Sequence, residues 1–178
     1  MPRDIWFIAD THFGHERVIR FGKRPFANVK EMDEALCANW SDRVRPQDLI
    51  YHLGDIAWNS DGLKLFEALP GTKRLILGNH DNGRLCAPLV QRLELFRRFP
   101  DDGFIASHMP MMPERGREPV NVHGHVHAVD VDHPAYVNVS VEKTHYRPLH
   151  IDELRERVRQ AHRALLGLRR LDPKRQTE

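Results

Sequence analysis

Side chains that can bind metal ions occur in five short motifs between residues 10 and 127. The motifs are Asp10-Thr11-His12, Gly54-Asp55, Gly78-Asn79-His80-Asp81, His108 and His123-Gly124-His125-Val126-His127. Together they offer carboxylates, imidazoles and one amide, and they contain no thiolate. Oxygen and imidazole ligands of this kind suit hard to borderline divalent metals. The sequence therefore predicts a metal site assembled from segments that are far apart in the chain.

Each motif follows a short apolar run that we interpret as a buried β-strand. The runs cover residues 5–9, 49–53, 75–77, 104–106 and 120–122. Ligands of α/β folds usually bind beyond the carboxyl ends of the strands, so we expect the five motifs to meet at one such edge. Within Asp10-x-His12 and His125-x-His127, side chains two residues apart point the same way if the backbone is extended. Each pair could then reach a single ion.

Apolar residues with a helical period lie between these strands. Their spacing of three or four residues predicts helices over residues 29–44, 63–69, 85–96 and 151–168, and residues 136–141 alternate as a sixth strand would. This alternation of strands and helices is typical of the α/β class. We expect one domain over residues 1–171 and a disordered tail over residues 172–178.

The bulk composition is that of an ordinary globular chain. Of its 178 residues, 40% are hydrophobic and 29% are charged, which fits one domain with a substantial core. No apolar run approaches the roughly 18 residues of a membrane-spanning helix, and the N-terminus leaves no room for a signal peptide. We therefore expect a cytoplasmic protein with no membrane partner. Cys37 and Cys86 lack a metal or disulfide spacing and are interpreted as reduced core thiols.

Positive charge is concentrated near the C-terminus, although the formal net charge of the chain is only +2. The basic residues from position 155 onward are Arg155, Arg157, Arg159, Arg163, Arg169, Arg170, Lys174 and Arg175. Two interpretations stay open. A solvated helix face with a frayed end is the favoured one, and a patch for a phosphate backbone is the alternative.

The motifs, in this order and each behind a strand, resemble those of the calcineurin-like metallophosphoesterase superfamily. The resemblance covers about residues 4–127, and it is closest to a small bacterial and phage branch whose first motif reads Asp-Thr-His-Phe-Gly-His, as residues 10–15 do here. It implies an α/β fold, a four-layer sandwich of two mixed β-sheets flanked by helices. It also implies hydrolysis of phosphodiesters, phosphomonoesters or both by a metal-bound hydroxide.

The same resemblance implies two divalent metal ions and assigns their ligands. The first ion would be held by Asp10, His12, Asp55 and His127, and the second by Asp55, Asn79, His108 and His125. Asp55 would bridge the ions, because one carboxylate can serve two ions about 3.5–4 Å apart. Two such ions keep a net positive charge and lower the pKa of a bound water towards about 7. Mn²⁺, Fe and Zn²⁺ all suit these ligands, and we favour Mn²⁺.

His80 has no ligand role in the family pattern, where the matching histidine contacts the substrate phosphate or protonates the leaving oxygen. We expect Asp81 to orient it. In larger phosphatases of the superfamily an acid follows the Gly-Asp motif by three residues and pairs with this histidine. That position is Trp58 here, which leaves the protonation state of His80 open.

Two further residues are candidates for substrate contact. His15 either hydrogen-bonds a metal ligand or touches the substrate. Arg24, in the loop beyond the first motif, is expected to contact phosphate. The 14 residues between His108 and His123 are too few for a capping domain. We therefore expect an open, shallow cleft between the Arg24 loop and residues 111–113. Such a cleft predicts broad, weak activity on small phosphoesters, with aryl diesters accepted at least as readily as monoesters.

Three functions remain for comparison. The leading one is a metal-dependent phosphoesterase whose partner is a phosphoester substrate, including nucleotides or nucleic acid. A nuclease acting on DNA or RNA is the alternative, with the basic C-terminal residues as its footing. A catalytically silent binding scaffold is disfavoured, because none of the predicted ligands is missing. The sequence does not determine the oligomeric state.

Overall fold

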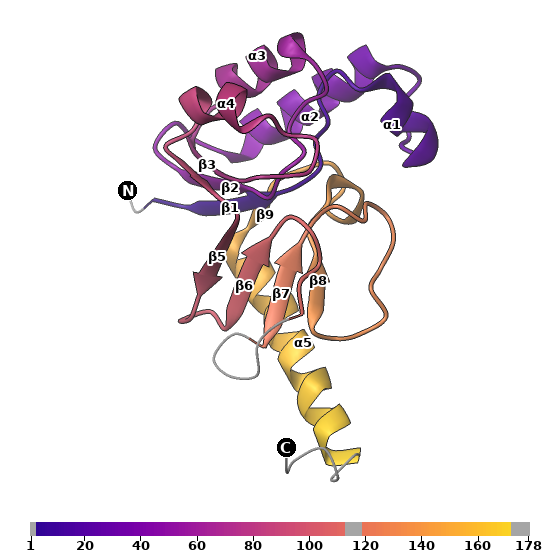
Figure 1. Cartoon of the computed structure of the whole chain (residues 1–178), viewed down its shortest axis with the longest axis vertical. Coiled ribbons are helices and arrows are strands. Elements are labelled where there is room, and N and C mark those ends of the chain that lie inside the picture. The colour runs from indigo at the N-terminus through magenta and orange to yellow at the C-terminus, as the bar shows by residue number, and fades with distance from the viewer. Residues whose placement is uncertain (1–2, 113–118, 172–178) are drawn as a thin grey trace.

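The strands form two sheets in the computed structural model, which describes residues 3–112 and 119–171. The expectation of a tail over residues 172–178 lies outside the described residues. The first sheet has the strand order β4-β3-β2-β1-β9 (Figure 1). It consists of β1 (Ile5–Ile8), β2 (Leu49–His52), β3 (Thr72–Ile76), β4 (Arg92–Glu94) and β9 (Leu149–His150). Its strands are parallel except β9, which is antiparallel to β1.

The second sheet has the order β5-β6-β7-β8. It consists of β5 (Phe96–Phe99), β6 (Phe104–Ser107), β7 (Val120–His123) and β8 (Tyr136–Asn138). β6, β7 and β8 are parallel to one another, and β5 is antiparallel to β6. Two mixed sheets flanked by helices confirm the architecture that the family resemblance implied.

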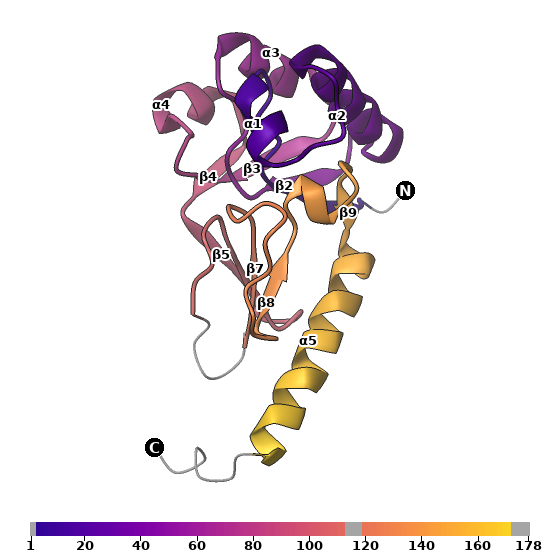
Figure 2. The same cartoon turned by 90° about the vertical axis from the view of Figure 1, so that its right-hand side faces the viewer.

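Helices cover both sheets. They are α1 (Glu16–Phe21), α2 (Val29–Arg43), α3 (Ser60–Ala68), α4 (Gly83–Cys86) and α5 (Ile151–Leu171), with 3-10 turns at Ala87–Leu89 and Val141–Lys143. Helices α1 to α4 lie on the side of the first sheet away from the second, and α5 runs along the second sheet and extends beyond it (Figures 1 and 2). None of the described helices has both the length and the apolar character needed to cross a membrane.

Local sequence explains where the main helices begin. The Asn28 side chain accepts a hydrogen bond from the Glu31 amide at 2.9 Å, and the Glu31 carboxylate accepts one from the Ala27 amide at 2.8 Å. Asn59 caps α3 in the same way, through the Gly62 amide at 2.9 Å. These side chains satisfy backbone donors that have no partner within the helix.

The first sheet is buried on both faces. Along β1 and the residue after it, Phe7 and Ala9 contribute to the core shared with the second sheet, whereas Trp6 and Ile8 contribute to the core under the helices. This alternation follows from the two-residue period of a strand. Burial on both faces fixes the strand ends from which the metal-binding motifs project.

The prediction of a helix over residues 85–96 is wrong. Helix α4 ends at Cys86, Leu93 lies in β4, and Phe96 begins β5. Pro88 has no amide hydrogen to donate and lies in a 3-10 turn. Residues 92–94 pair with β3 as a strand, although the leucines have the spacing of a helix. Helix α1 was not predicted, and the strand predicted over residues 136–141 ends at Asn138.

Candidate metal centre

All the predicted ligands lie just beyond the carboxyl ends of parallel strands. They follow β1 (Asp10, His12), β2 (Asp55), β3 (Asn79), β6 (His108) and β7 (His125, His127). Six of these seven residues form two groups whose ligand atoms lie within 4.8 Å of one another. One group is Asp10, His12 and His127, and the other is Asp55, His108 and His125. Each group therefore takes ligands from both sheets.

Asp55 joins the two groups. Its Oδ2 lies 3.5 Å from His12 Nε2 and 3.5 Å from His108 Nε2, so one carboxylate oxygen faces an imidazole of each group. The amide oxygen of Asn79 lies 2.9 Å from His108 Nε2, which places Asn79 beside the second group. The seven predicted ligands are thus brought together around the Asp55 carboxylate.

The backbone at the site is left-handed at most of these residues. Asp10, His12, Asp55, His125 and His127 have φ between 50° and 69°. Residues other than glycine rarely adopt this backbone conformation. It occurs where the surrounding structure imposes it, often at functional sites. The Asp10 amide donates to Gly54 O at 3.0 Å and the His12 amide to Asp55 O at 3.0 Å. Our premise that Asp10-x-His12 and His125-x-His127 remain extended is therefore wrong, and tight turns orient these side chains instead.

Two glycines allow the close approach of these turns. A Cβ added at Gly124 would lie 2.5 Å from Asp10 Oδ2 and 2.6 Å from the Ala9 Cβ. A Cβ added at Gly78 would overlap the Asp55 carboxylate. Only glycine fits at either position without moving a carboxylate of the site.

Two of the imidazoles use Nδ1 for hydrogen bonds outside the group of ligands. The Nδ1 of His108 donates to Leu53 O at 2.8 Å, because a carbonyl oxygen can only accept. The Nδ1 of His127 donates to the Glu142 carboxylate at 2.9 Å. In both residues Nε2 is then the nitrogen left to bind a metal. In His108 this nitrogen faces two other candidate ligands, with Asn79 Oδ1 at 2.9 Å and Asp55 Oδ2 at 3.5 Å. Both ring nitrogens of His12 are buried without a hydrogen-bond partner in the part of the chain that the structure describes.

Electrostatics at the site also fit bound cations. Burial raises the pKa of Asp10 to about 6, although His108 and His127 act in the opposite direction, so charge within the protein compensates the ionised carboxylate only in part. Burial also lowers the pKa of His12, which keeps the imidazole neutral and able to ligate. For Asp55, burial acts to raise the pKa, but His108, the His80 amide and His12 together lower it below its usual range. Two carboxylates, four imidazoles and an amide are a ligand set that fits two divalent ions.

His80 and Asp81 take different positions. His80 is exposed, and its ring centre lies 5.6 Å from that of His12. The backbone amide of His80 donates to Asp55 Oδ1 at 2.9 Å. The Asp81 carboxylate accepts hydrogen bonds from the amides of Asp55, Ile56 and Gly78 at 2.8–2.9 Å. These contacts hold the turn that carries Asp55. Orientation of His80 by Asp81 stays a prediction, and none of the hydrogen bonds described for Asp81 involves the His80 ring.

Arg24 is buried beneath the site. Its guanidinium donates to Asp10 O at 2.7 Å, to Thr11 O at 3.0 Å and to the Glu142 carboxylate at 2.8–2.9 Å. The Arg24 side chain is fully buried and therefore does not line an open cleft in this conformation. A direct phosphate contact by Arg24 stays a prediction, and these hydrogen bonds favour a positioning role for it instead.

Glu142 is a residue that the sequence reasoning missed. It binds both Arg24 and His127, although it lies 118 and 15 residues from them in the chain. A signal for it was present. Glu142 directly follows the strand predicted over residues 136–141, just as the ligand motifs follow theirs.

His15 lies beside the first group of ligands. Its ring centre is 5.3 Å from that of His12 and 4.0 Å from that of Trp58, on which it stacks. Its Nδ1 is buried and lacks a hydrogen-bond partner among the described residues. Both roles expected for His15, support of a ligand and contact with substrate, stay predictions.

Comparison with known proteins places this geometry in a family. A model of the calcineurin-like phosphoesterase family matches residues 3–173. The uncharacterized protein MJ1445 of Methanocaldococcus jannaschii is 35% identical over 164 residues, which cover 84% of this chain and 88% of that protein. The gene 66 protein of Mycobacterium phage D29 is 28% identical over 194 residues, covering 87% of this chain and 96% of the phage protein.

A solved structure has the same fold. The crystal structure of AQ665 from Aquifex aeolicus, described as a protein of unknown function, matches with a TM-score of 0.69 and 26% sequence identity. The match covers 87% of this chain and 99% of the Aquifex chain. With a family model that spans nearly the whole chain, and with two groups of aspartate and histidine side chains at the ends of its strands, the chain belongs to the calcineurin-like phosphoesterase family.

Proposed function

We propose that the protein hydrolyses phosphoesters, both diesters and monoesters, with the help of two divalent metal ions. The observation that carries this proposal is the position of Asp55 Oδ2, 3.5 Å from His12 Nε2 in one group and 3.5 Å from His108 Nε2 in the other. A carboxylate shared in this way is what a two-metal site requires. The ligands of the two ions would be Asp10, His12, Asp55 and His127, and Asp55, Asn79, His108 and His125.

Bound ions would supply hydroxide from water at neutral pH and stabilise the charge that develops on the phosphoryl oxygens. The protein itself would orient the substrate and move protons. His80 is exposed beside the site, while its amide is fixed by Asp55 Oδ1 at 2.9 Å. We infer that the His80 ring protonates the leaving oxygen, a role that suits an imidazole near neutral pH. Mn²⁺ is the favoured metal, with Fe and Zn²⁺ as alternatives.

The nuclease alternative is not favoured by the basic helix. Of the four described arginines of α5, three have acidic partners: Arg155 pairs with Asp102 at 2.7 Å, Arg159 with Glu156 at 2.7 Å, and Arg163 with Glu156 at 3.8 Å. The fourth, Arg157, donates to Lys143 O at 3.5 Å. Charges that already have acidic partners are poor anchors for a phosphate backbone. Weak dependence of substrate binding on salt would agree with this interpretation.

The test is an activity screen of protein stripped of metal and then reloaded with Mn²⁺, Fe²⁺ or Zn²⁺ in separate samples. Substrates are an aryl monoester, an aryl diester, a cyclic nucleotide and a short oligonucleotide. We expect hydrolysis only after reloading, with the aryl diester accepted at least as readily as the monoester. Absence of hydrolysis with every metal would contradict the proposal. A preference of about a hundredfold for the monoester would contradict the open cleft.

A further inference from the structure

Trp58 is the exposed one of the three tryptophans. Trp40 is fully buried and Trp6 is 9% exposed, whereas Trp58 is 54% exposed. Its backbone is nevertheless fixed, because the Trp58 amide donates to Phe13 O at 2.9 Å. A single exposed apolar side chain is ordinary on a protein surface, so the significance of Trp58 depends on what surrounds it.

The indole of Trp58 borders the metal centre. It stacks on the His15 ring at 4.0 Å with an interplanar angle of 9°, and its centre lies 5.5 Å from that of His80. Both histidines in turn adjoin the His12 ring, at 5.3 and 5.6 Å. His15 covers one face of the indole, and more than half of the residue remains open beside the candidate metal ligands.

Phe21 provides a second exposed ring at the same place. It is 58% exposed and meets the His15 ring edge-on at 5.7 Å and the His127 ring at 5.6 Å. Trp58 and Phe21 therefore flank the same histidine, and Phe21 also touches a candidate metal ligand. We call these two rings the aromatic rim.

We propose that the aromatic rim stacks on the nucleobase of the substrate, so that the preferred phosphoesters are nucleotides. This inference rests on the proposed function, because the phosphate would lie at the metal centre. Every base has a flat π-face, and stacking on an aromatic side chain strengthens binding without requiring a particular base. The neutral indole of Trp58 also adds no negative charge that would repel the phosphate.

The kinetic test compares AMP with ribose 5-phosphate, which has the same phosphoester and no base. In the metal-loaded protein we expect kcat/KM for AMP to exceed that for ribose 5-phosphate by roughly tenfold or more. Trp58→Ala should bring the ratio towards one, and Trp58→Phe should retain most of it. Equal efficiencies in the wild type, or an unchanged ratio in Trp58→Ala, would overturn the inference.

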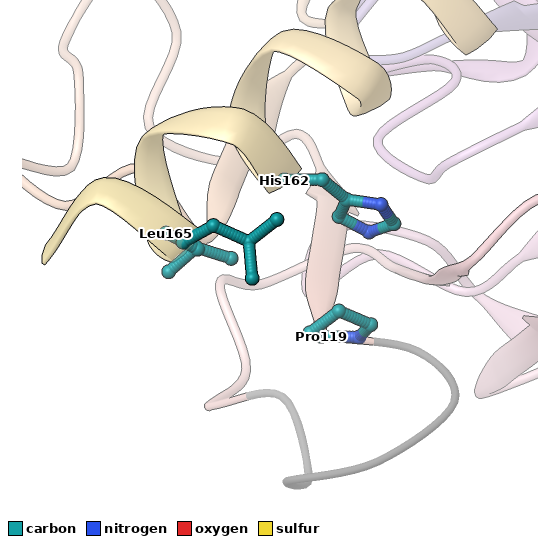
Figure 3. A pocket seen from close by; sticks show the side chains of 4 residues that line it. Pro119, His162 and Leu165 are labelled. Carbon is teal, nitrogen blue, oxygen red and sulfur yellow. The ribbon is translucent and has the colours of Figure 1, made fainter. Parts of the chain in front are cut away.

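A matched control removes exposed apolar surface elsewhere. Leu166 is 56% exposed on α5, where it lines a small pocket with Pro119, His162 and Leu165 (Figure 3). Pro119 precedes β7, whereas the candidate ligands His125 and His127 follow it, so the pocket lies at the other end of that strand. Leu166→Ala should leave the ratio of the two efficiencies as in the wild type.

A binding measurement separates this inference from the proposed function. AMP should quench the tryptophan fluorescence of the Zn²⁺-loaded protein in the first milliseconds of a stopped-flow record, before turnover. Ribose 5-phosphate should not, and Trp58→Phe should abolish the quenching. Quenching by AMP without hydrolysis of either compound would support the aromatic rim and contradict the phosphoesterase. Hydrolysis of both compounds without quenching or preference would do the reverse.

Discussion

The Glu142 carboxylate accepts a hydrogen bond of 2.9 Å from Nδ1 of His127, a candidate ligand of the first ion. The same carboxylate oxygen lies 2.8 Å from the Arg24 guanidinium, which in turn holds the backbone of Asp10. Carboxylates behind a ligating histidine fix its tautomer and orientation. Glu142 thus couples two segments of the first ligand group.

Replacing Glu142 with Gln should lower the affinity for the first ion more than the affinity for the second. The amide lacks the charge that holds both His127 and Arg24, and loss of such a partner commonly lowers metal affinity by about 10–100-fold. Metal titration followed by elemental analysis measures the effect. Glu156→Gln, a partly exposed residue of α5 that pairs with Arg159, is the control. Equal affinities in Glu142→Gln and wild type would contradict the positioning role.

Asp55→Asn should abolish hydrolysis and lower the occupancy of both metals, since Asp55 is the residue whose carboxylate faces both groups. Elemental analysis after gel filtration gives the number of metals per chain. Asp61→Asn, an exposed substitution at the start of α3, should retain both metals. Two retained metals and full turnover in Asp55→Asn would sink the bridging assignment.

His80→Asn should leave the metal content near that of the wild type and reduce kcat by roughly 10²–10⁴, the usual contribution of a general acid. The reduction should be smaller for nitrophenyl esters than for alkyl esters, because a good leaving group needs little protonation. Rates for the two ester classes provide the measurement. An equal reduction for both would indicate that His80 binds phosphate instead.

Gly124→Ala should lower both metal content and Tm. The added methyl group would lie 2.5 Å from Asp10 Oδ2, so the carboxylate or the turn must move. Gly167→Ala is a suitable control, because nothing lies within 4 Å of a Cβ at that helical position. There the change should stabilise α5 by about 0.5–1 kcal/mol. A Tm unchanged by Gly124→Ala would refute the close approach.

The buried His52 should make the fold sensitive to acid. Its Nε2 lies 2.9 Å from Thr11 Oγ1, its Nδ1 accepts from the Gly54 amide at 3.2 Å, and burial lowers its pKa to about 3. Between its ordinary pKa of about 6.5 and this value, the unfolded chain binds the extra proton. The contribution to stability is therefore complete above that range and is lost as the pH falls, by about 1.4 kcal/mol per pH unit.

The measurement is urea denaturation in the presence of a chelator over this pH range, for wild type and His52→Gln. The variant keeps an amide donor and acceptor but cannot take up a proton. Its free energy of unfolding should fall less steeply with decreasing pH. Parallel curves for the two proteins would show that His52 does not contribute.

Local patterns predicted β1, β2, β3, β6, β7 and β8, because each contains an apolar run that is visible in the local sequence, whereas β4, β5 and β9 were not predicted. Six of the candidate ligands, which follow these runs within a few residues, lie in the two groups that the structure brings together. The prediction of a helix over residues 85–96 was wrong because the structure there depends on a segment that is distant in the sequence. The pairing partner of β4 lies at Arg74–Ile76, and no local spacing reports such a contact. The place of Glu142 after a predicted strand was a local signal, but its pairing with Arg24, and with it the burial of Arg24, depends on a contact across 118 residues. Left-handed turns at Asp10 and Asp55 likewise follow from tertiary hydrogen bonds and not from residue type.

Each ligand group takes residues from both sheets, with Asp10 and Asp55 from the first and His127, His108 and His125 from the second. Ions held there would act as cross-links between the two halves of the sandwich. Their binding free energy would then add to the cohesion between the sheets, because ligands that bind only the native state stabilise it by mass action. Loading with metal would therefore raise the temperature or denaturant concentration at which the two sheets come apart, and both sheets would unfold in one cooperative transition.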